Sequence, residues 1–499
     1  MRSMFGRVLA AALVAGTVLL APASAQRRSK LKLASVFGDH MVLQRGVKVP
    51  VWGKAGAEQW LAVRFRHDTY RTRADENGDW RVDIGPYEPG PPDDLWVTSA
   101  GVKRLKDVLV GDVWLCSGQS NMEWPVRLSN DAEREVPNAA HSQLRLFRVA
   151  HKPADEPMRQ VEGSWQLCSP ETIPDFSAVA YSFGRELQVS LDVPIGLIQS
   201  TWGGTPAEAW TSREGLAARD ELGPILESWD AAAADFAKQL SAWEQASVAA
   251  QEKGDEPPPR PQREDRDQAA SALYNGMIAP LVPAALRGVI WYQGESNASR
   301  AYEYRALFTA LIEDWRRVLG AELPFYFVQL ANFKTDDPAS WAELREAQTM
   351  ALALPHTGMA VTIDIGNPTD IHPRNKQEVG RRLALWALSD SYGKELVCSG
   401  PLFTWHEIEG ASIRVHFTYA GGGLTTRGGA APQGFEVASA DGDFVPAEAT
   451  IDGATIVVKS DAVPEPAHVR YAWTDNPENA NVVNRERLPA SPFRTDERR

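Results

Sequence analysis

Strand-like apolar runs alternate with helical stretches through the middle of the chain, and this alternation constrains the fold most. The runs are continuous, as in strands whose two faces are both buried. They are Val108–Cys116, Ile195–Gln199, Gly288–Gln293, Phe325–Leu330 and Met359–Asp364. The helical stretches are Val179–Val189, Tyr302–Val318, Ser340–Leu354 and Lys376–Leu388. The alternation predicts an α/β domain at residues 108–397, with a parallel sheet covered by helices.

Two β-rich regions flank this domain. In the first, Asn77-Gly78 predicts a hairpin between Arg71–Arg73 and Trp80–Ile84, and we interpret residues 30–107 as a small β-sandwich. After residue 398 short alternating runs return, and Asp452-Gly453 predicts a second hairpin. The 499 residues therefore divide into a β-sandwich-like domain, the α/β domain and a C-terminal β region at 398–495.

Residues 212–270 interrupt the α/β pattern. Their apolar residues recur at three- and four-residue spacing, which is typical of one helix face: Leu226, Trp229, Ala233, Phe236, Leu240 and Trp243. A polar, Pro-rich linker follows at Gly254–Pro261. We predict a helical insertion, and two interpretations stay open, a lid or wall of a substrate site and a packed helical arm.

The first 25 residues have the pattern of a secretory signal peptide. Arg2 and Arg7 precede an apolar run from Val8 to Leu20, and Ala23-Ser24-Ala25 gives a small-x-small site with cleavage expected after Ala25. The run is too short to span a bilayer, and no later stretch approaches 18 apolar residues. We therefore expect a soluble protein that is secreted or periplasmic.

Charge and cysteine content narrow the possible partners. The net charge of −13 falls to −15 without Arg2 and Arg7, which argues against nucleic acid and anionic membranes but not against neutral glycans. The three Cys match no metal-binding spacing, and their odd number leaves at least one thiol free. Cys116 is expected to be buried, and a Cys168–Cys398 disulfide is possible. Nothing in the sequence indicates an oligomeric state.

Four segments with polar or reactive side chains each follow one of the predicted parallel strands. Ligands of open α/β sheets bind at the carboxyl ends of the strands. The first segment, Cys116–Pro125, places Ser120 after a glycine-containing turn. A serine there can stand above the sheet beside backbone N–H groups, as a nucleophile requires, although many such serines only cap a helix.

The next two segments supply possible hydrogen-bond donors. Gly203-Gly204, within Gln199–Trp210, lets the backbone approach a ligand closely, so that an N–H can bind an oxyanion. Within Trp291–Asn297, the amide of Gln293 can donate to a carbonyl oxygen, and Glu295 can orient neighbours or act as an acid. Trp291 and Tyr292 can wall a pocket. The alternative for Gly203-Gly204 is an ordinary tight turn, and that for Trp291–Asn297 is a strand end whose hydrogen bonds satisfy loop backbone.

The fourth segment, Asp364–Lys376, holds His372 in a loop with flanking prolines. Asp370 lies two residues earlier. A histidine that acts as a general base needs an acceptor that fixes its tautomer, and Asp370 is the first candidate.

The four motifs together resemble those of the sialate O-acetylesterase family, which belongs to the SGNH hydrolase superfamily of carbohydrate esterases. They read Gly-Gln-Ser-Asn-Met-Glu-Trp-Pro, Trp-Gly-Gly-Thr-Pro-Ala-Glu-Ala-Trp, Trp-Tyr-Gln-Gly-Glu-Ser-Asn and Asp-Ile-His-Pro-Arg-Asn-Lys. The resemblance runs from about residue 30 to the C-terminus and includes Val36–Gln44. It implies a flavodoxin-like α/β core with helices on both faces of a parallel sheet, flanked by N- and C-terminal β-rich regions. It also implies hydrolysis of acetyl esters of a carbohydrate without a cofactor or metal.

The resemblance also implies residue roles. Ser120 matches the nucleophile and His372 the base, and the expected oxyanion hole comprises the N–H groups of Ser120 and of Gly203-Gly204 with the amide of Gln293. The residues expected to bind substrate are Trp124, Trp202, Trp291, Glu295 and Asn297. Many SGNH enzymes carry the supporting Asp three residues before the His, where this chain has Thr369. His372 can therefore be oriented by Asp370, by a backbone carbonyl, or by Glu295 or Asp364.

Three alternatives are weighed against a sialate O-acetylesterase. An esterase for plant hemicellulose acetates, such as xylan or xyloglucan acetates, would have the same motifs, because pocket loops select the sugar. A non-catalytic glycan-binding protein would suit the 17 Trp but leaves the Ser120/His372 pair unexplained. A glycosidase acting through Glu123, Glu208 and Glu295 would leave Ser120 and His372 idle.

Overall fold

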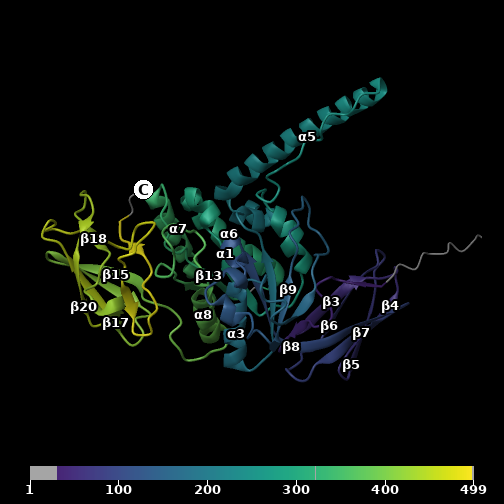
Figure 1. Cartoon of the computed structure of the whole chain (residues 1–499), viewed down its shortest axis with the longest axis horizontal. Coiled ribbons are helices and arrows are strands. Elements are labelled where there is room, and N and C mark those ends of the chain that lie inside the picture. The colour runs from purple at the N-terminus through teal and green to yellow at the C-terminus, as the bar shows by residue number, and fades with distance from the viewer. Residues whose placement is uncertain (1–30, 321, 497–499) are drawn as a thin grey trace, which may run out of the picture.

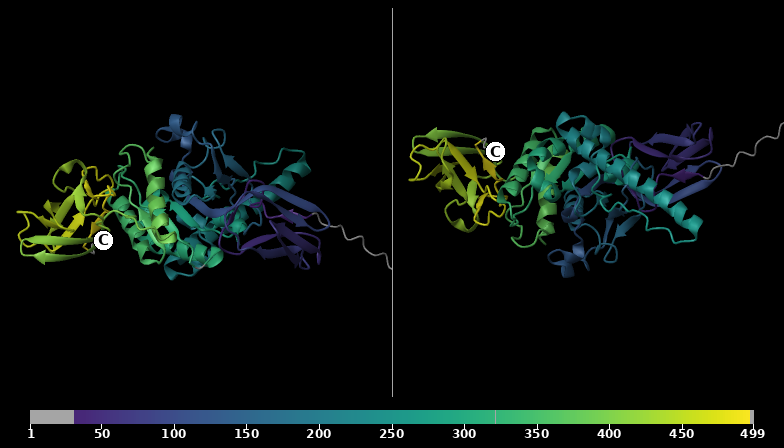
Figure 2. Two further views of the ribbon diagram at one scale, coloured as in Figure 1. Left: turned by 90° about the horizontal axis from the view of Figure 1, so that it is seen from below. Right: turned by 90° about the horizontal axis from the view of Figure 1, so that it is seen from above.

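The computed structural model describes residues 31–320 and 322–496. An α/β body lies between two β-rich regions, which occupy opposite ends of the molecule (Figures 1 and 2). One continuous cluster of buried apolar side chains, from Leu31 to Phe493, runs through all three parts. The predicted signal peptide lies outside the described residues. Within the described part of the chain, no helix is both long enough and apolar enough to cross a membrane.

The body is built on a mixed sheet whose strands follow the order β10-β9-β11-β8-β12-β13-β14. All neighbours from β9 to β14 are parallel, which confirms the predicted parallel sheet, and only the edge strand β10 is antiparallel. The strands are β8 (Val102–Gly118), β9 (His141–Arg148), β10 (Trp165–Cys168), β11 (Ile195–Thr201), β12 (Gly288–Tyr292), β13 (Phe325–Val328) and β14 (Thr357–Ala360). The sequence patterns missed β9 and β10.

Helices cover both faces of this sheet. Trp114 of β8 packs against Phe183 of α3, whereas Trp291 of β12 packs against Trp315 of α6 on the opposite face. The helix α3 also packs against α8, and α6 against α7. The long helices are α3 (Ala178–Leu191), α6 (Ala301–Leu319), α7 (Pro338–Met350) and α8 (Lys376–Trp386), and the short ones are α1 (Ser120–Glu123), α2 (Ala132–Glu135) and α4 (Arg213–Ala217).

The N-terminal β region contains two sheets, of which only the second shares β8 with the body. One consists of β1 (Lys32–Leu33), β3 (Val49–Lys54) and β6 (Asp79–Ile84), and the other of β4 (Trp60–Phe65), β5 (Asp68–Arg73), β7 (Asp93–Thr98) and the first part of β8. β2 (Val42–Gln44) also pairs with β8. Because β8 continues from residue 102 to 118, the boundary expected at residue 107 falls inside a strand.

The hairpin predicted at Asn77-Gly78 is wrong. β5 pairs with β4, and β6 pairs with β3, so the two strands belong to different sheets. The carboxylate of Asp75 accepts the N–H groups of Asn77 and Asp79, both at 2.8 Å. This side chain makes the turn that carries the chain from one sheet to the other.

The C-terminal β region contains two four-stranded sheets and one strand pair. The first sheet has the order β15 (Leu402–Glu409), β16 (Ser412–Thr418), β21 (Thr455–Lys459) and β20 (Glu448–Asp452). The second has the order β19 (Val445–Pro446), β18 (Phe435–Ala438), β22 (His468–Tyr471) and β24 (Phe493–Arg494), and β17 (Leu424–Thr426) pairs with β23 (Val482–Asn484). The hairpin predicted at Asp452-Gly453 is confirmed, since β20 and β21 are antiparallel neighbours.

The predicted insertion contains α5 (Gly223–Lys253), which projects from the body as an arm (Figure 1). Only Ile225 and Ser247 of this helix are buried. The chain after it returns along the helix, where Trp243 Nε1 donates to the Pro258 carbonyl at 2.8 Å and Arg263 lies over the ring of Trp229. The apolar stripe of α5 therefore packs against its own return segment.

All three cysteines are buried, free thiols. The burial expected of Cys116 is confirmed, and Cys168 and Cys398 form no disulfide. Burial raises the pKa of all three thiols, that of Cys168 to about 12.

Candidate active site

Ser120 and His372, which are far apart in the sequence, are in hydrogen-bond contact. Ser120 is the first residue of α1, immediately after β8, and its Oγ lies 2.8 Å from Nε2 of His372. Gly118, at φ +135°, lies where β8 leads into α1. A Cβ at this position would lie 2.1 Å from the carbonyl oxygen of Tyr292. Only glycine permits this close approach, so the turn that presents Ser120 depends on it.

The pair lies where the strand order reverses. From β8 the chain passes to β9 and β11 on one side and then crosses to β12 on the other, which is the arrangement that creates a ligand-binding crevice in open α/β sheets. All four predicted segments follow parallel strands at this edge. Ser120 follows β8, Gly203-Gly204 follows β11, Gln293 follows β12, and His372 lies between β14 and α8.

The ring of His372 is held by an aromatic neighbour. It stacks on Trp124 at a centroid distance of 4.9 Å and an angle of 14°, and 28% of the side chain is exposed. Burial lowers the pKa of His372, and the nearby cation of Lys376 lowers it further, against the opposing effect of Asp370. The imidazole is therefore neutral at pH 7 and able to accept a proton.

Asp370 contacts the main chain of His372 and not its ring. Its Oδ1 accepts the backbone N–H of His372 at 2.9 Å and lies 3.8 Å from Nδ1. Among the described residues, Nδ1 has no hydrogen-bond partner. Asp370 thus stabilises the loop and makes no hydrogen bond with Nδ1 in this geometry, so that its expected role in fixing the tautomer stays a prediction.

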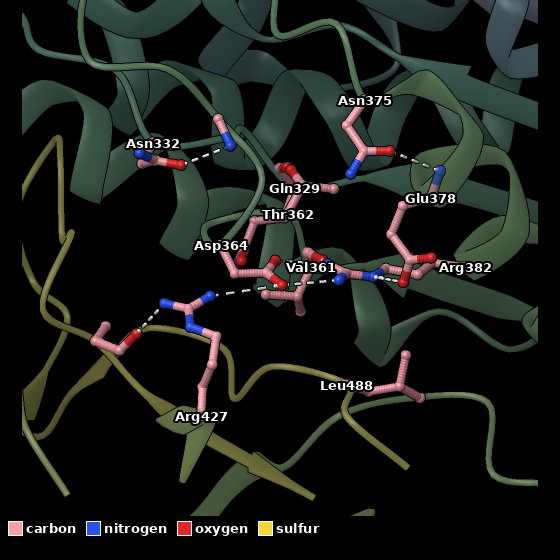
Figure 3. A network of polar contacts seen from close by, with 12 residues as sticks. Gln329, Asn332, Val361, Thr362, Asp364, Asn375, Glu378, Arg382, Arg427 and Leu488 are labelled. Carbon is pink, nitrogen blue, oxygen red and sulfur yellow. Dashed lines mark hydrogen bonds and ion pairs between the residues drawn. The ribbon is translucent and has the colours of Figure 1, made fainter. Parts of the chain in front are cut away.

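The two other carboxylates that could have oriented His372 make different contacts. Asp364 lies between two guanidinium groups (Figure 3), at 2.6 and 2.8 Å from Arg382 and 3.8 Å from Arg427 of the C-terminal region. Arg382 also donates to the Val361 carbonyl at 2.6 Å. Asp364 therefore fixes the beginning of the His372 loop without approaching the ring.

Glu295 reaches the loop through Asn121. The Asn121 amide donates to Glu295 Oε1 at 2.6 Å and to the Ile371 carbonyl at 2.9 Å, and its Oδ1 accepts from Lys376 Nζ. Burial raises the pKa of Glu295 and lowers that of Lys376 to about 7. Glu295 thus supports the His372 loop through Asn121, and its expected role in substrate binding stays a prediction.

The Gly203-Gly204 turn lies against Ser120. A Cβ on Gly203 would stand 3.2 Å from the Cβ of Ser120. The Gly203 N–H, an expected oxyanion donor, is already engaged, since it donates to Glu123 Oε2 at 2.7 Å. For the N–H of Gly204, whose φ is +75°, no acceptor is found in the described chain.

Gln293 is not free to bind an oxyanion. Its amide hydrogens donate to the Thr205 carbonyl at 3.3 Å and to Asn297 Oδ1 at 2.6 Å, and its Oε1 accepts from Tyr304 Oη at 3.0 Å. Asn297 is likewise fully buried and bonded to the Ala207 N–H and to Glu208 Oε2. The expected roles of Gln293 in the oxyanion hole and of Asn297 in substrate binding are therefore corrected to roles in fixing the loops.

The three tryptophans expected at the substrate differ in position. Trp291 is wholly buried among Trp210, Trp315 and Phe325, so it belongs to the core. Trp124 and Trp202 are only partly buried, Trp124 against the ring of His372 and Trp202 directly before Gly203.

Trp202 stacks on a residue outside the four motifs, His151. The two ring centroids are 4.3 Å apart, and His151 Nε2 lies 2.9 Å from Glu123 Oε1. Trp124 and Trp202 therefore stay as candidates for a sugar-facing surface.

Asn121 and Lys376 were also missed as site residues, although both lie inside the quoted motifs. Asn121 directly follows Ser120, and Lys376 ends the motif of His372, so motif membership was the available signal. Within residues 31–320 and 322–496, no group of three or more His, Cys, Asp or Glu side chains could hold a metal ion.

Comparison with known proteins gives consistent matches. The family model described as carbohydrate esterase, sialic acid-specific acetylesterase matches residues 110–249 and 262–389. The chain is 32% identical over 445 residues to a sialate O-acetylesterase of Rattus norvegicus, covering 78% of this chain and 79% of the relative.

The sialate O-acetylesterase of Homo sapiens is 33% identical over 440 residues, with 79% and 78% covered. The crystal structure of a novel carbohydrate acetylesterase from Xanthomonas citri has a TM-score of 0.83 and 41% identity, and the match covers 94% of this chain and all of that one.

Proposed function

Because the chain belongs to the family of sialic acid-specific carbohydrate acetylesterases, and is therefore a carboxylic ester hydrolase, we propose that Ser120 and His372 carry out its reaction through an acetyl-enzyme. The observation that carries this proposal is the 2.8 Å contact between Ser120 Oγ and His372 Nε2 at the switch point of the sheet. Nucleophile and base within hydrogen-bond distance are the arrangement that covalent acyl transfer requires.

In the first half-reaction Ser120 Oγ attacks the acetyl carbonyl carbon while its proton passes to His372 Nε2. The tetrahedral intermediate collapses as His372 returns that proton to the departing sugar oxygen, and the acetyl group stays on Ser120. In the second half-reaction His372 takes a proton from a water molecule, whose oxygen attacks the acetyl carbonyl carbon. The bond to Ser120 Oγ then breaks, acetate leaves, and His372 returns the proton to Ser120. The lowered pKa of His372 keeps it unprotonated at the start of each half.

The negative oxygen of the intermediate needs nearby donors. We assign this role to the N–H groups of Ser120 and Gly204. Ser120 begins α1, and the N–H groups of a first helical turn have no acceptor within the helix. Gly204 follows Gly203, which packs against Ser120, whereas Gly203 and Gln293 donate elsewhere.

The substrate we propose is an O-acetylated carbohydrate. The curated relatives are sialate O-acetylesterases, while the relative from Xanthomonas citri is described only as a carbohydrate acetylesterase. Acetate release from O-acetylated sialic acid, acetylated xylan and acetylated xyloglucan would identify the preferred sugar. Absence of acetate release from every acetylated glycan would favour the non-catalytic glycan-binding alternative.

The direct test of the site is Ser120→Ala, assayed with p-nitrophenyl acetate. We expect turnover to fall to near background, because removal of the nucleophile leaves only binding and oxyanion stabilisation. The variant should keep the wild-type melting temperature. Substantial turnover by the folded variant would refute the role of Ser120.

We also propose that the body is a flavodoxin-like SGNH hydrolase core. Without β9 and β10, the sheet order β11-β8-β12-β13-β14 corresponds to 2-1-3-4-5 in chain order, which is the flavodoxin-like order.

The pattern of residues 1–25 supports secretion. N-terminal sequencing of protein recovered from the periplasm or medium should then begin at Gln26.

A further inference from the structure

Three polar side chains from three elements meet behind the Ser120/His372 pair. Asn121 belongs to α1, Glu295 begins a short helix after β12 (Glu295–Arg300), and Lys376 is the first residue of α8. Asn121 is 1% exposed and Lys376 is 0% exposed. Asn121 and Lys376 are therefore too deeply buried to contact a substrate directly.

The hydrogen bonds give the Asn121 amide one orientation. Its nitrogen donates to Glu295 Oε1 and to the Ile371 carbonyl, and its oxygen accepts from the Lys376 ammonium group. A flipped amide would place its oxygen against two acceptors and its nitrogen against a cation. An asparagine thus satisfies all three neighbours, which neither an aspartate nor an aliphatic residue could do.

The charges of Lys376 and Glu295 compensate each other through the Asn121 amide, which bonds both groups. Lys376 Nζ lies 5.2 Å from the centroid of the Tyr292 ring and 5.9 Å from that of Trp124. Glu295 Oε2 is buried, and no hydrogen-bond partner for it is found in the described chain. Buried charges are costly without a partner. Because Lys376 and Glu295 nevertheless lie beside the Ser120/His372 pair, we infer that they serve a purpose other than stability.

The positions of Asn121 and Ile371 in the chain indicate what this purpose is. Asn121 directly follows Ser120, and Ile371 directly precedes His372. One amide therefore connects the neighbour of the nucleophile to the neighbour of the base. The charged groups that face His372 are Lys376 of α8 and Asp370 of its own loop, and those that face Lys376 are Glu295 and Asp370.

We propose that Lys376, Asn121 and Glu295 form a buried positioning relay that holds His372 against Ser120. Because Lys376 is one of the charged groups that act on His372, its removal also changes the pH dependence of the pair. The inference rests on the proposed function in that His372 is taken as the base. Lys376 and Glu295 are positioning residues, since each acts through Asn121 or through the electric field at His372.

The first experiment compares Lys376→Met with Lys394→Met, a matched change at an exposed lysine beyond the C-terminal end of α8. We expect kcat of Lys376→Met on p-nitrophenyl acetate to fall about 10²-fold with little change in KM, as for a displaced catalytic group. The acid limb of kcat/KM should also shift to higher pH, because the cation that disfavours the imidazolium form is gone. An acid limb identical to that of Lys394→Met would overturn the proposal.

The second experiment tests whether the two charges act together. Glu295→Gln alone leaves Lys376 buried without its counter-charge, while Lys376→Met/Glu295→Gln removes both charges. The loss of kcat in the double variant should therefore be smaller than the product of the two single losses. Losses that simply multiply would show that the residues act independently.

A third measurement works without turnover and with a variant that removes no charge. In Asn121→Ala, the rate at which diisopropyl fluorophosphate inactivates Ser120 should fall, because the amide no longer holds the His372 loop. A wild-type inactivation rate in folded Asn121→Ala would overturn the relay. Ser120→Ala keeps the two proposals distinguishable. If it stays active, the proposed function fails, and if it is inactive while Asn121→Ala and Lys376→Met behave as wild type, only the relay fails.

Discussion

Oδ1 of Asp370 accepts the backbone N–H of His372 at 2.9 Å and lies 3.8 Å from Nδ1 of the same residue. In a buried Ser-His-Asp triad the acid bonds Nδ1 and fixes the tautomer of the base. Here the acid is 48% exposed and bonds the main chain. The proposed Ser120/His372 pair is therefore supported through its loop and by the stacked ring of Trp124, and less through a third charged residue.

We predict that Asp370→Asn lowers kcat/KM less than tenfold. The amide oxygen can still accept the His372 N–H, and a half-exposed charge contributes only about 1 kcal/mol, which corresponds to less than a tenfold change. Because Asp370 raises the pKa of His372, its loss should also move the acid limb of kcat/KM to lower pH. A pH series of initial rates with p-nitrophenyl acetate measures both effects.

Asp370→Ala is the matched comparison, because it removes the acceptor as well as the charge, and its loss should exceed that of Asp370→Asn. A drop of about 10⁴-fold in Asp370→Asn, as in a buried triad, would instead show that the carboxylate bonds Nδ1 during the reaction.

The wild-type enzyme should reach half-maximal kcat/KM below pH 6.5. His372 must be neutral to accept the Ser120 proton, and burial together with Lys376 lowers its pKa from the ordinary value of 6.5. Activity is thus lost as the pH falls through this lowered pKa, and it persists at mildly acidic pH. Initial rates between pH 4 and 8 in buffers of constant ionic strength test this, and a midpoint above 6.5 would contradict it.

The sequence predicted the body of the fold where strands are buried on both faces. β8, β11 and β12 appear as continuous apolar runs. β9 was missed because Arg145 interrupts its apolar run. This arginine is buried through an ion pair with Asp107 at 2.7 Å, a contact between distant segments that no local pattern reveals.

In the site, the meeting of Ser120 and His372 could be predicted because their segments follow parallel strands that end at one edge of the sheet, and because both residues lie in the quoted motifs. The contacts that a side chain makes at a strand end could not be predicted from the sequence. The side chains of Gln293 and Trp291 are engaged elsewhere, because Thr205, Asn297 and Tyr304 bond the amide, and Trp210 and Trp315 enclose the indole.

Gln293→Met should reduce stability more than catalysis. The change keeps most of the volume but leaves the Thr205 carbonyl and Tyr304 Oη without the Gln293 amide, while Asn297 Oδ1 keeps the Ala207 N–H. Each unsatisfied buried group costs about 1–3 kcal/mol, which urea denaturation measures. If the folded variant lost about 10²–10³-fold in kcat at unchanged stability, Gln293 would be an oxyanion donor after all.

The three thiols should react only after unfolding. Cys116, Cys168 and Cys398 are buried, and burial raises their pKa values, so that the thiolate is scarce at neutral pH. We expect negligible reaction of the native protein with Ellman's reagent and three equivalents in guanidinium chloride without reductant. A single equivalent in denaturant would reveal a disulfide.

Gly203→Ala should lower kcat far more than Gly204→Ala, although both glycines lie in one turn. A Cβ on Gly203 would stand 3.2 Å from Ser120 Cβ and 3.5 Å from its Cα, and this contact pushes the nucleophile from His372. A displacement of that kind costs about 10²-fold in kcat. A Cβ on Gly204 meets nothing within 4 Å, but its φ of +75° strains alanine by about 1–2 kcal/mol.

Gly203→Ala and Gly204→Ala should therefore differ both in kcat and in melting temperature. Gly204→Ala should lower the melting temperature and keep its N–H donor, with the smaller loss of kcat, whereas Gly203→Ala should melt close to the wild type and turn over slowly. Equal losses of kcat at equal stability would mean that the contact between Gly203 and Ser120 does not position the nucleophile.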